Sequence, residues 1–302
     1  MEGVSEIDGY GDLLSQVREI DRFRIETAVE QRQADDSKAD GASPFVVYIS
    51  GIDSRNGMVS QSLSDVNIVA AVNPKTHQVL LVSTPRDYYV PLSISNGARD
   101  KLTHAGWYGV DVSMATIGML YDIDVDYYFR VSFEGFKDIV DAVGGVTVYS
   151  ESSFTASPSG YYFSEGENHL DGAHALAFAR ERHAFASGDR QRGKNQMAII
   201  RAILNKAISP ELLRSYSAVL RAVEGCFETT VPYDLIAALV RNQLDGGGEW
   251  NIVNYSVDGW DDMQVPYSLN ARAYVMQPYE EDVETAKTLM QQVMNGEIIT
   301  AP

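Results

Sequence analysis

SDVNIVAAVNPKTHQVLLVSTPRD, residues 64–87, contains two apolar runs joined by a turn and followed by charged residues. Residues 66–74 and 78–85 are rich in Val, Ile and Leu, which is typical of buried strands. The Asn, Pro and Lys residues between the runs predict a turn. The stretch therefore predicts two neighbouring strands, with an Arg-Asp pair where the second strand ends.

Strands and helices alternate along the rest of the chain. Further strands are predicted at residues 45–50, 126–132, 146–150 and 250–257, and helices at 110–122, 133–143, 191–208, 233–244 and 280–294. Asp171 is expected to cap a helix that continues through Arg182, and Pro210 to begin another. This alternation predicts an α/β layered fold.

The composition sets limits on the class of protein. The chain has 302 residues, 45% of them hydrophobic, and a formal net charge of -18. We expect residues 1–43 to form a polar N-terminal helix, at 13–33, and a linker. Residues 44–302 are expected to form the folded domain, in which 210–302 is an extension of helices and strands. The acidity argues against broad nucleic-acid binding, because most of the surface would repel a duplex.

The cysteine count says little about the cellular compartment, whereas the pattern of apolar residues limits it. Cys226 is the single cysteine, so an internal disulfide is excluded. Neither a run of about 18 apolar residues nor the basic and apolar regions of a signal peptide occur. We therefore expect either a cytosolic protein or one whose N-terminal anchor is missing from this chain.

Positive charge concentrates in ARERHAFASGDRQRGKNQ, residues 179–196, although the chain as a whole is acidic. Such segregation favours a binding face, while a solvated helix face is the alternative. Arg180 and Arg182 lie two residues apart near a predicted helix end. Arg192 and Gln196 lie four apart and would share one face of the next helix. Lys101, in DKLTHA, is a further candidate cation.

Carboxylates and an arginine lie near the ends of the first predicted strands. Asp53 and Asp65 each lie close to a strand end, where open α/β sheets place ligands, and carboxylates suit Mg²⁺. The alternative is that both aspartates cap turns. Arg86 would neutralise charge on a phosphoryl group, or would pair structurally with Asp87. Carboxylates that can hold a metal, together with arginines that can bind phosphate through two hydrogen bonds, indicate a pyrophosphate site.

Other catalytic patterns do not occur. The histidines lack metal-ligand spacing such as HExxH and are expected to be surface or partly buried residues. The glycine-rich stretches lack the Lys-Ser/Thr of a phosphate-binding P-loop, and no nucleophile elbow is present.

Several motifs in order resemble one family. GIDSR, SDVNIVAAVNPKTHQVLLVSTPRDYYV, KLTHA, DYYFRVSFEGFKDIVDAVGGVTV, HLDGAHALAFARER and GDRQRGKNQ together resemble the LytR-CpsA-Psr family of bacterial cell-envelope proteins. The resemblance covers about residues 44–209. It implies a three-layer α/β/α sandwich with a central mixed sheet. One departure is Leu63, because the family commonly has arginine two residues before the second acid.

The resemblance also implies an activity. It implies transfer of a glycopolymer from a polyprenyl-pyrophosphate carrier onto peptidoglycan or a related wall acceptor, with Mg²⁺ or Mn²⁺. The implied domain is extracytoplasmic, held at the bacterial membrane by an N-terminal anchor. By their match to the family's motifs, the expected roles are metal binding for Asp53 and Asp65, catalysis for Arg86 and Asp87, and pyrophosphate binding for Arg180, Arg182, Arg192 and Gln196.

Two other activities stay open on the sequence. A polyprenyl-pyrophosphate phosphatase would use the same residues with water as acceptor. A non-catalytic module would bind lipid or polymer without turnover. The resemblance places the isoprenoid tail in an apolar channel between sheet and helices, and assigns no role to the region after about residue 211.

Overall fold

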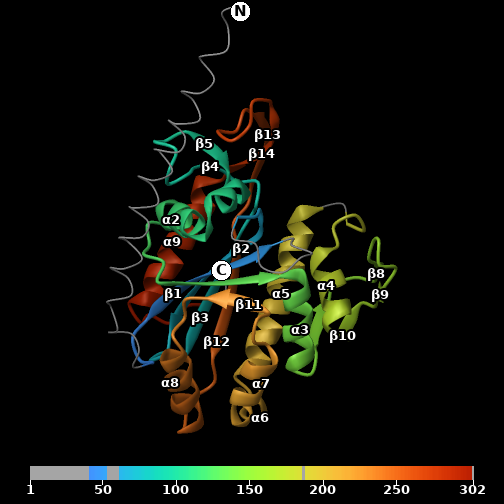
Figure 1. Ribbon diagram of the computed structural model, residues 1–302, viewed down its shortest axis with the longest axis vertical. Coiled ribbons are helices and arrows are strands. Elements are labelled where there is room, and N and C mark those ends of the chain that lie inside the picture. Colours follow the sequence, from blue (N-terminus) through green and yellow to red (C-terminus); the bar gives the residue numbers. More distant parts are fainter. Residues whose placement is uncertain (1–40, 53–60, 186–187, 301–302) are drawn as a thin grey trace, which may run out of the picture. The chain divides into compact units, whose positions relative to one another are not determined.

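The computed structural model describes residues 41–52, 61–185 and 188–300. The expected helix at 13–33 and the expected metal ligand Asp53 lie outside these ranges. The described residues build one α/β unit around a six-stranded sheet, shown in Figure 1.

The sheet has the strand order β11-β6-β1-β2-β3-β12. Its strands are β1 (Phe45–Ile52), β2 (Ser64–Asn73), β3 (Gln78–Thr84), β6 (Tyr127–Ser132), β11 (Phe227–Thr229) and β12 (Asn251–Ser256). The pairs β1–β6 and β3–β12 are parallel, whereas β1–β2, β2–β3 and β6–β11 are antiparallel. The mixed sheet expected from the resemblance is confirmed.

This topology brings several strand ends to one edge. β1, β3, β6 and β12 run in one direction, so their C-terminal ends meet the N-terminal end of the antiparallel β2. Within the β2–β3 pair, Asn67 lies opposite Thr84. Continuing this register by two residues brings Asp65 opposite Arg86, at the edge where α/β sheets place ligands.

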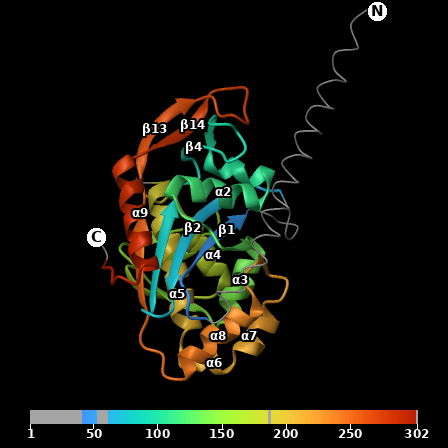
Figure 2. The same cartoon turned by 90° about the vertical axis from the view of Figure 1, so that its left-hand side faces the viewer.

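Helices cover both faces of the sheet (Figures 1 and 2). One face carries α2 (Val110–Tyr121) and α9 (Glu280–Met294), and α9 contacts β2 and β3. The other carries α5 (Asp189–Ala207) together with α3 (Phe133–Ala142), α4 (Gly172–Arg180), α6 (Pro210–Arg214), α7 (Tyr216–Ala222) and α8 (Tyr233–Leu244). The expected three layers are confirmed.

Alternate residues of the central strands form two separate cores. Tyr48, Val69 and Leu80 pack toward α2 and α9, while Val47 and Ile68 pack toward α5. Successive strand side chains point to opposite faces, and both faces are buried, so the strands have continuous apolar runs. This is why the apolar stretches in the sequence predicted them well.

Short elements complete the fold, and they were not predicted except for the strand at 146–150. They are β4 (Tyr89–Pro91) with β5 (Arg99–Lys101), β7 (Val146–Ser150) with β10 (Gly166–Leu170), β8 (Phe154–Thr155) with β9 (Tyr162–Phe163), and β13 (Gly259–Gln264) with β14 (Ala273–Pro278). A 3₁₀ helix, η2 (Leu102–Tyr108), follows β5. Most of these elements are too short or too polar to show an apolar period.

One helix boundary differs from the prediction. Asp171 caps α4 by accepting a hydrogen bond from the His174 backbone, as expected, but α4 ends at Arg180 and does not reach Arg182. Glu181 leaves the helical conformation, since its buried carboxylate accepts backbone hydrogen bonds from Ser157 (2.5 Å) and Ala184 (2.8 Å). Among the described residues, we find no helix with the length and apolarity needed to cross a bilayer.

Candidate functional site: a cationic pocket joined to an apolar channel

A polar pocket of about 310 Å³ opens where β3 and β12 end. Its lining comes from three parts of the chain: the β2–β3 region, the first turns of α5 and the segment from β12 to β14. The charged residues in the lining are Asp65, Arg86, Asp87, Arg190, Arg192, Lys194 and Asp258. Four cations thus meet three carboxylates in a protein whose overall charge is strongly negative.

Arg86 lies at the centre of a chain of ion pairs. Its Nη1 lies 2.8 Å from Asp65 Oδ1, and its Nε lies 3.4 Å from Asp87 Oδ2. Asp87 Oδ1 in turn accepts a 2.8 Å hydrogen bond from Lys101 Nζ. These contacts fix the guanidinium at the pocket wall. Arg86 can therefore pair structurally with Asp87 and also bind an anion in the pocket.

The start of α5 supplies the other cations. Arg190 binds Asp258 through Nε (2.7 and 2.8 Å) and donates from Nη2 to the Gly259 carbonyl. The hydrogen bond to Asp258 raises the pKa of Arg190 above its usual value. Arg192 and Lys194, two and four residues further along α5, also line the pocket. The N-terminal end of a helix also attracts anions through its dipole and free N–H groups.

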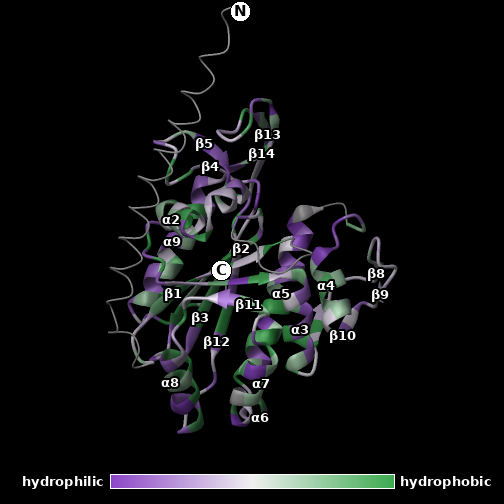
Figure 3. Cartoon of the chain, viewed as in Figure 1, coloured by the Kyte–Doolittle hydropathy of each residue, from purple (hydrophilic) through white to green (hydrophobic). Residues whose placement is uncertain are grey.

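A second cavity, the apolar channel, lies between the sheet and the helices that include α5. It has a volume of about 520 Å³. Its walls are almost entirely aliphatic and aromatic, including Val47, Val72, Phe129, Ile200 and Leu204. Figure 3 shows hydrophobic stretches on α3 and α5 beside the strands. A cavity of this kind accepts a hydrocarbon chain, which agrees with the expectation of a channel between sheet and helices.

Gln196 lines both the pocket and the channel. The two cavities therefore meet on α5, where the polar first turns of the helix give way to Ile199, Ile200 and Ile203. Asn195 is buried and joins α5 to α4, since its Nδ2 donates to the Phe178 carbonyl (3.0 Å). The cationic pocket and the apolar channel are thus neighbours that share Gln196 in their walls.

The two remaining arginines of the expected set lie elsewhere. Arg180 is exposed at the end of α4, stacks over the Phe133 ring at 4.3 Å, and lines the apolar channel but not the polar pocket. Arg182 lines neither cavity. Burial raises the pKa of Glu181, but backbone hydrogen bonds from Ser157 and Ala184 outweigh it, so the pKa lies below its usual value. Glu181 thereby holds the loop between these two arginines.

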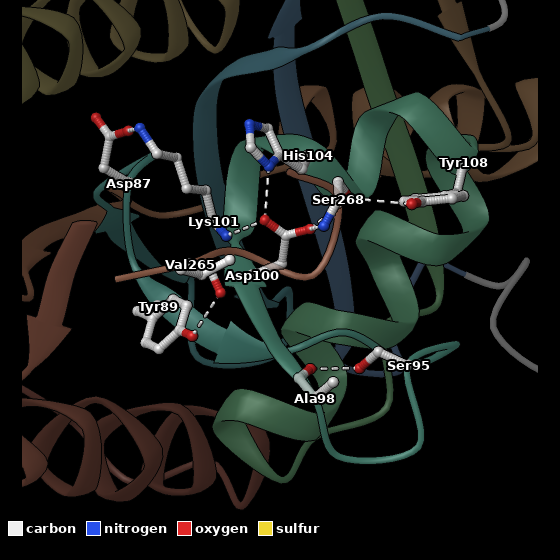
Figure 4. A network of polar contacts seen from close by, with 10 residues as sticks. All are labelled: Asp87, Tyr89, Ser95, Ala98, Asp100, Lys101, His104, Tyr108, Val265 and Ser268. Carbon is white, nitrogen blue, oxygen red and sulfur yellow. Dashed lines mark hydrogen bonds and ion pairs between the residues drawn. The ribbon is translucent and has the colours of Figure 1, made fainter. Parts of the chain in front are cut away.

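A buried carboxylate holds the region around Lys101. Asp100 is fully buried and accepts hydrogen bonds from the Lys101 backbone (2.7 Å), His104 Nδ1 (2.6 Å) and the backbone and hydroxyl of Ser268 (Figure 4). Burial raises the pKa of Asp100, but the hydrogen bonds from His104 and Ser268 outweigh it, so its pKa is below the usual range. His104 is buried and stacks on Trp107, in contrast to the expectation of a surface or partly buried histidine.

The donor chemistry at Asp65 fits a hard divalent cation. Its Oδ1 pairs with Arg86, whereas its Oδ2 accepts no hydrogen bond from any residue that the structure describes. Carboxylate oxygens beside a phosphate pocket suit Mg²⁺, which takes few protein ligands. Within the described ranges, no cluster of three or more His, Cys, Asp or Glu residues could hold a metal. The second expected ligand, Asp53, lies outside those ranges.

The structure thus brings together Asp65, Arg86, Asp87, Arg192 and Gln196, with Lys101 behind Asp87. Sequence reasoning missed Asp258, Tyr274 and Met276, which line the pocket from the last third of the chain. No motif marks them, and only the pairing of β12 with β3 and the contacts of β14 with β4 bring them to the site.

Comparisons with known proteins agree with this geometry. The teichoic acid transferase TagU of Bacillus mycoides (strain KBAB4), named polyisoprenyl-teichoic acid--peptidoglycan teichoic acid transferase, is 37% identical over 207 residues, which are 68% of this chain and 66% of TagU. TagU of Bacillus subtilis (strain 168) is 36% identical over 192 residues, 63% of this chain and 61% of that protein. The match thus spans no more than two thirds of either TagU.

Solved structures share the fold over nearly their whole length. The crystal structure of B. subtilis TagV superposes with a TM-score of 0.71 at 27% identity, covering 84% of this chain and 98% of TagV. A structure of TagT bound to LI-WTA superposes with a TM-score of 0.69 at 27% identity, covering 85% of this chain and 92% of TagT. The sequence profile of the LytR_cpsA_psr family matches residues 16–291. The chain belongs to the LytR-CpsA-Psr family.

Proposed function

We propose that this protein is a metal-dependent phosphotransferase that moves a glycopolymer from a polyprenyl-pyrophosphate carrier onto peptidoglycan or a related cell-wall acceptor. The observation that carries the proposal is the junction of the cationic pocket with the apolar channel at Gln196. A lipid diphosphate has the same two parts, a charged head and a hydrocarbon tail. The names of the TagU relatives, with their polyisoprenyl-linked donor and peptidoglycan acceptor, support this assignment.

The pocket residues have the chemistry to hold the diphosphate. Arg86, Arg192 and Lys194 present positive charge, and the N-terminal end of α5 adds its dipole. Phosphoryl transfer requires mainly positioning and neutralisation of charge on the phosphate oxygens. The Arg86 guanidinium, fixed by Asp65, is oriented before the substrate arrives, so little ordering is left for the transition state.

The reaction exchanges one phosphorus–oxygen bond for another. The acceptor hydroxyl oxygen attacks the phosphorus next to the glycan, and the bond between that phosphorus and the bridging oxygen breaks. The hydroxyl proton passes to the Asp87 carboxylate, which lies beside Arg86 and Lys101. The products are a phosphodiester that joins the glycopolymer to the acceptor and a polyprenyl monophosphate.

Asp65, together with Asp53, would hold the divalent cation. When bound, that ion would neutralise part of the negative charge on the diphosphate. A cell-wall acceptor lies outside the cytoplasmic membrane, and the polyprenyl chain of the donor would hold the donor in that membrane. We therefore also propose an extracytoplasmic location in which an N-terminal anchor holds the domain near the carrier.

The experiment combines the protein with a short-chain polyprenyl-diphosphate glycan, Mg²⁺, and soluble peptidoglycan oligosaccharides. The release of polyprenyl monophosphate is followed by chromatography with and without the acceptor. We expect polyprenyl monophosphate to be released only when the acceptor is present. Equal release without acceptor would identify water as the acceptor and a phosphatase, and binding without any release would identify a non-catalytic module.

A further inference from the structure

The β13–β14 hairpin carries three large apolar side chains that are exposed. Trp260 is 50% exposed, Met263 47% and Tyr274 39%. Figure 1 shows the hairpin beside β4 and β5, at the top of the view. Met263 and Tyr274 are paired across the hairpin, so they form one exposed apolar surface, and such a surface is a candidate contact for a ligand.

The two faces of the hairpin differ. Asp261 pairs with Met276 and Met263 pairs with Tyr274, so these four side chains lie on one face, which we call the pocket face. Tyr274 and Met276 also line the cationic pocket. Trp260 lies on the opposite face, where its ring is 5.7 Å from that of Tyr279. The pocket face therefore continues the wall of the pocket outward.

Hydrogen bonds connect the pocket face to the proposed base. The Met276 backbone N–H donates to the Asp87 carbonyl at 2.8 Å. Lys101 Nζ lies 2.8 Å from Asp87 Oδ1 and 5.8 Å from the centre of the Tyr274 ring. A molecule that lies on Tyr274 is thus next to the carboxylate that would take the acceptor proton.

The hairpin is also fixed at its far end. In the segment between β13 and β14, Ser268 donates to the buried Asp100 from both its backbone and its hydroxyl, and Tyr108 Oη lies 3.0 Å from Ser268 Oγ. Tyr89 Oη donates to the Val265 carbonyl at 3.2 Å. Figure 4 shows these contacts around Asp100. A surface held at both ends needs little ordering when a ligand binds.

We propose that the pocket face is the subsite for the acceptor glycan strand. An aromatic ring offers its face to the C–H groups of a sugar, and a carboxylate beside it accepts hydrogen bonds from sugar hydroxyls. Tyr274 and Asp261 form this pair, since Tyr274 Oη donates to Asp261 Oδ1 at 2.9 Å. The inference rests on the proposed function, because Asp87 as base must contact the acceptor. In the proposed function the carrier tail would occupy the apolar channel, which meets the pocket at Gln196.

The first test measures binding of a peptidoglycan tetrasaccharide to the protein by calorimetry, without a lipid donor. Tyr274→Ala should weaken binding by about 10-fold, a loss typical of one aromatic contact. Tyr274→Phe keeps the ring and should stay within about threefold of the parent. Trp260→Ala, on the opposite face of the same hairpin, is the matched control and should bind normally. The inference is wrong if Tyr274→Phe lowers the tetrasaccharide affinity as much as Tyr274→Ala does. It is also wrong if Trp260→Ala lowers that affinity as much as either.

The second test uses the transfer reaction and separates this inference from the proposed function. Tyr274→Ala should raise the KM for the acceptor by more than the KM for the donor. An equal rise in both, or a rise for the donor alone, would assign the surface to the donor glycan and overturn the inference. Tetrasaccharide binding that depends on Tyr274 without any transfer by the parent protein would support the glycan subsite and refute the transferase.

Discussion

Arg86 Nη1 lies 2.8 Å from Asp65 Oδ1, and this contact connects the end of β3 to the start of β2. The two residues occupy opposite positions of the extended β2–β3 register, so the hairpin itself brings them together. In this contact Asp65 Oδ1 orients the guanidinium, and Oδ2 accepts no hydrogen bond from the described residues. If Asp65 holds the proposed cation, the same carboxylate couples the cation to the guanidinium of Arg86.

Replacing Arg86 should remove most of the transferase activity. Arg86→Ala should lower the transfer rate by about 100-fold or more, as expected when a group that stabilises transition-state charge is lost. Arg86→Lys should be intermediate, because it keeps the charge but loses the fork that contacts Asp65 and Asp87. Arg201→Ala, an exposed arginine on α5 outside both cavities, is the control. Equal rates for Arg86→Ala and Arg201→Ala would refute the role of Arg86.

Replacing Asp65 should weaken metal binding directly. Asp65→Asn removes the anionic oxygen that a hard cation prefers. Titration of Mn²⁺ followed by electron paramagnetic resonance should show at least about 10-fold weaker binding. Asp124→Asn alters an exposed aspartate after α2 and should leave the affinity unchanged. If both variants bind Mn²⁺ as the parent does, Asp65 is not a ligand.

Narrowing the apolar channel should affect the lipid tail and not the diphosphate. Ile200→Trp replaces an aliphatic side chain in the channel with a larger indole ring. We therefore expect the affinity for a long-chain polyprenyl diphosphate to fall by about 10-fold. The affinity for inorganic pyrophosphate should change little. Met119→Trp, at a side chain that is 57% exposed on α2, controls for the bulk of the ring. If Ile200→Trp weakens the binding of both ligands equally, the lipid tail does not lie in the channel.

The Asp100 network should make stability depend on pH at the acid end. The pKa of Asp100 is lower in the folded protein than in an unfolded chain, so its contribution is present above about pH 4. The contribution is lost as the pH falls below that value. Asp100→Asn should lower the unfolding free energy at pH 7 by about 1–3 kcal/mol, because a buried donor is left without its acceptor. Urea unfolding of both proteins at pH 7 and pH 3.5 checks this. The variant should lose less stability than the parent on acidification, and an equal loss would contradict the account.

The central sheet and the longer helices were predictable because their residues are apolar over whole elements. The helices at Tyr233–Leu244 and Glu280–Met294 have the predicted bounds, and β2 and β3 lie where the apolar runs placed them. The proximity of Asp65 to Arg86 follows from the β2–β3 register, which the structure supplies. Where both faces of a strand are buried, its continuous apolar composition is sufficient to predict the strand.

The remainder of the site depends on contacts between distant residues. Asp258 lies 68 residues from its partner Arg190, and Ser268 lies 168 residues from Asp100. In β13 the apolar residues Trp260 and Met263 are separated by two aspartates, so no strand period of apolar residues marks it. The sequence pairing of Arg180 with Arg182 assumed a continuous helix, which the buried Glu181 carboxylate interrupts.

The most direct test of the transferase is the mass of the acceptor after the reaction. A peptidoglycan tetrasaccharide is incubated with the protein, Mg²⁺ and a polyprenyl-diphosphate glycan, and the products are analysed by mass spectrometry. The tetrasaccharide should gain the mass of the glycan plus one phosphate while the carrier leaves as polyprenyl monophosphate. A tetrasaccharide of unchanged mass, with the donor hydrolysed or intact, would contradict it.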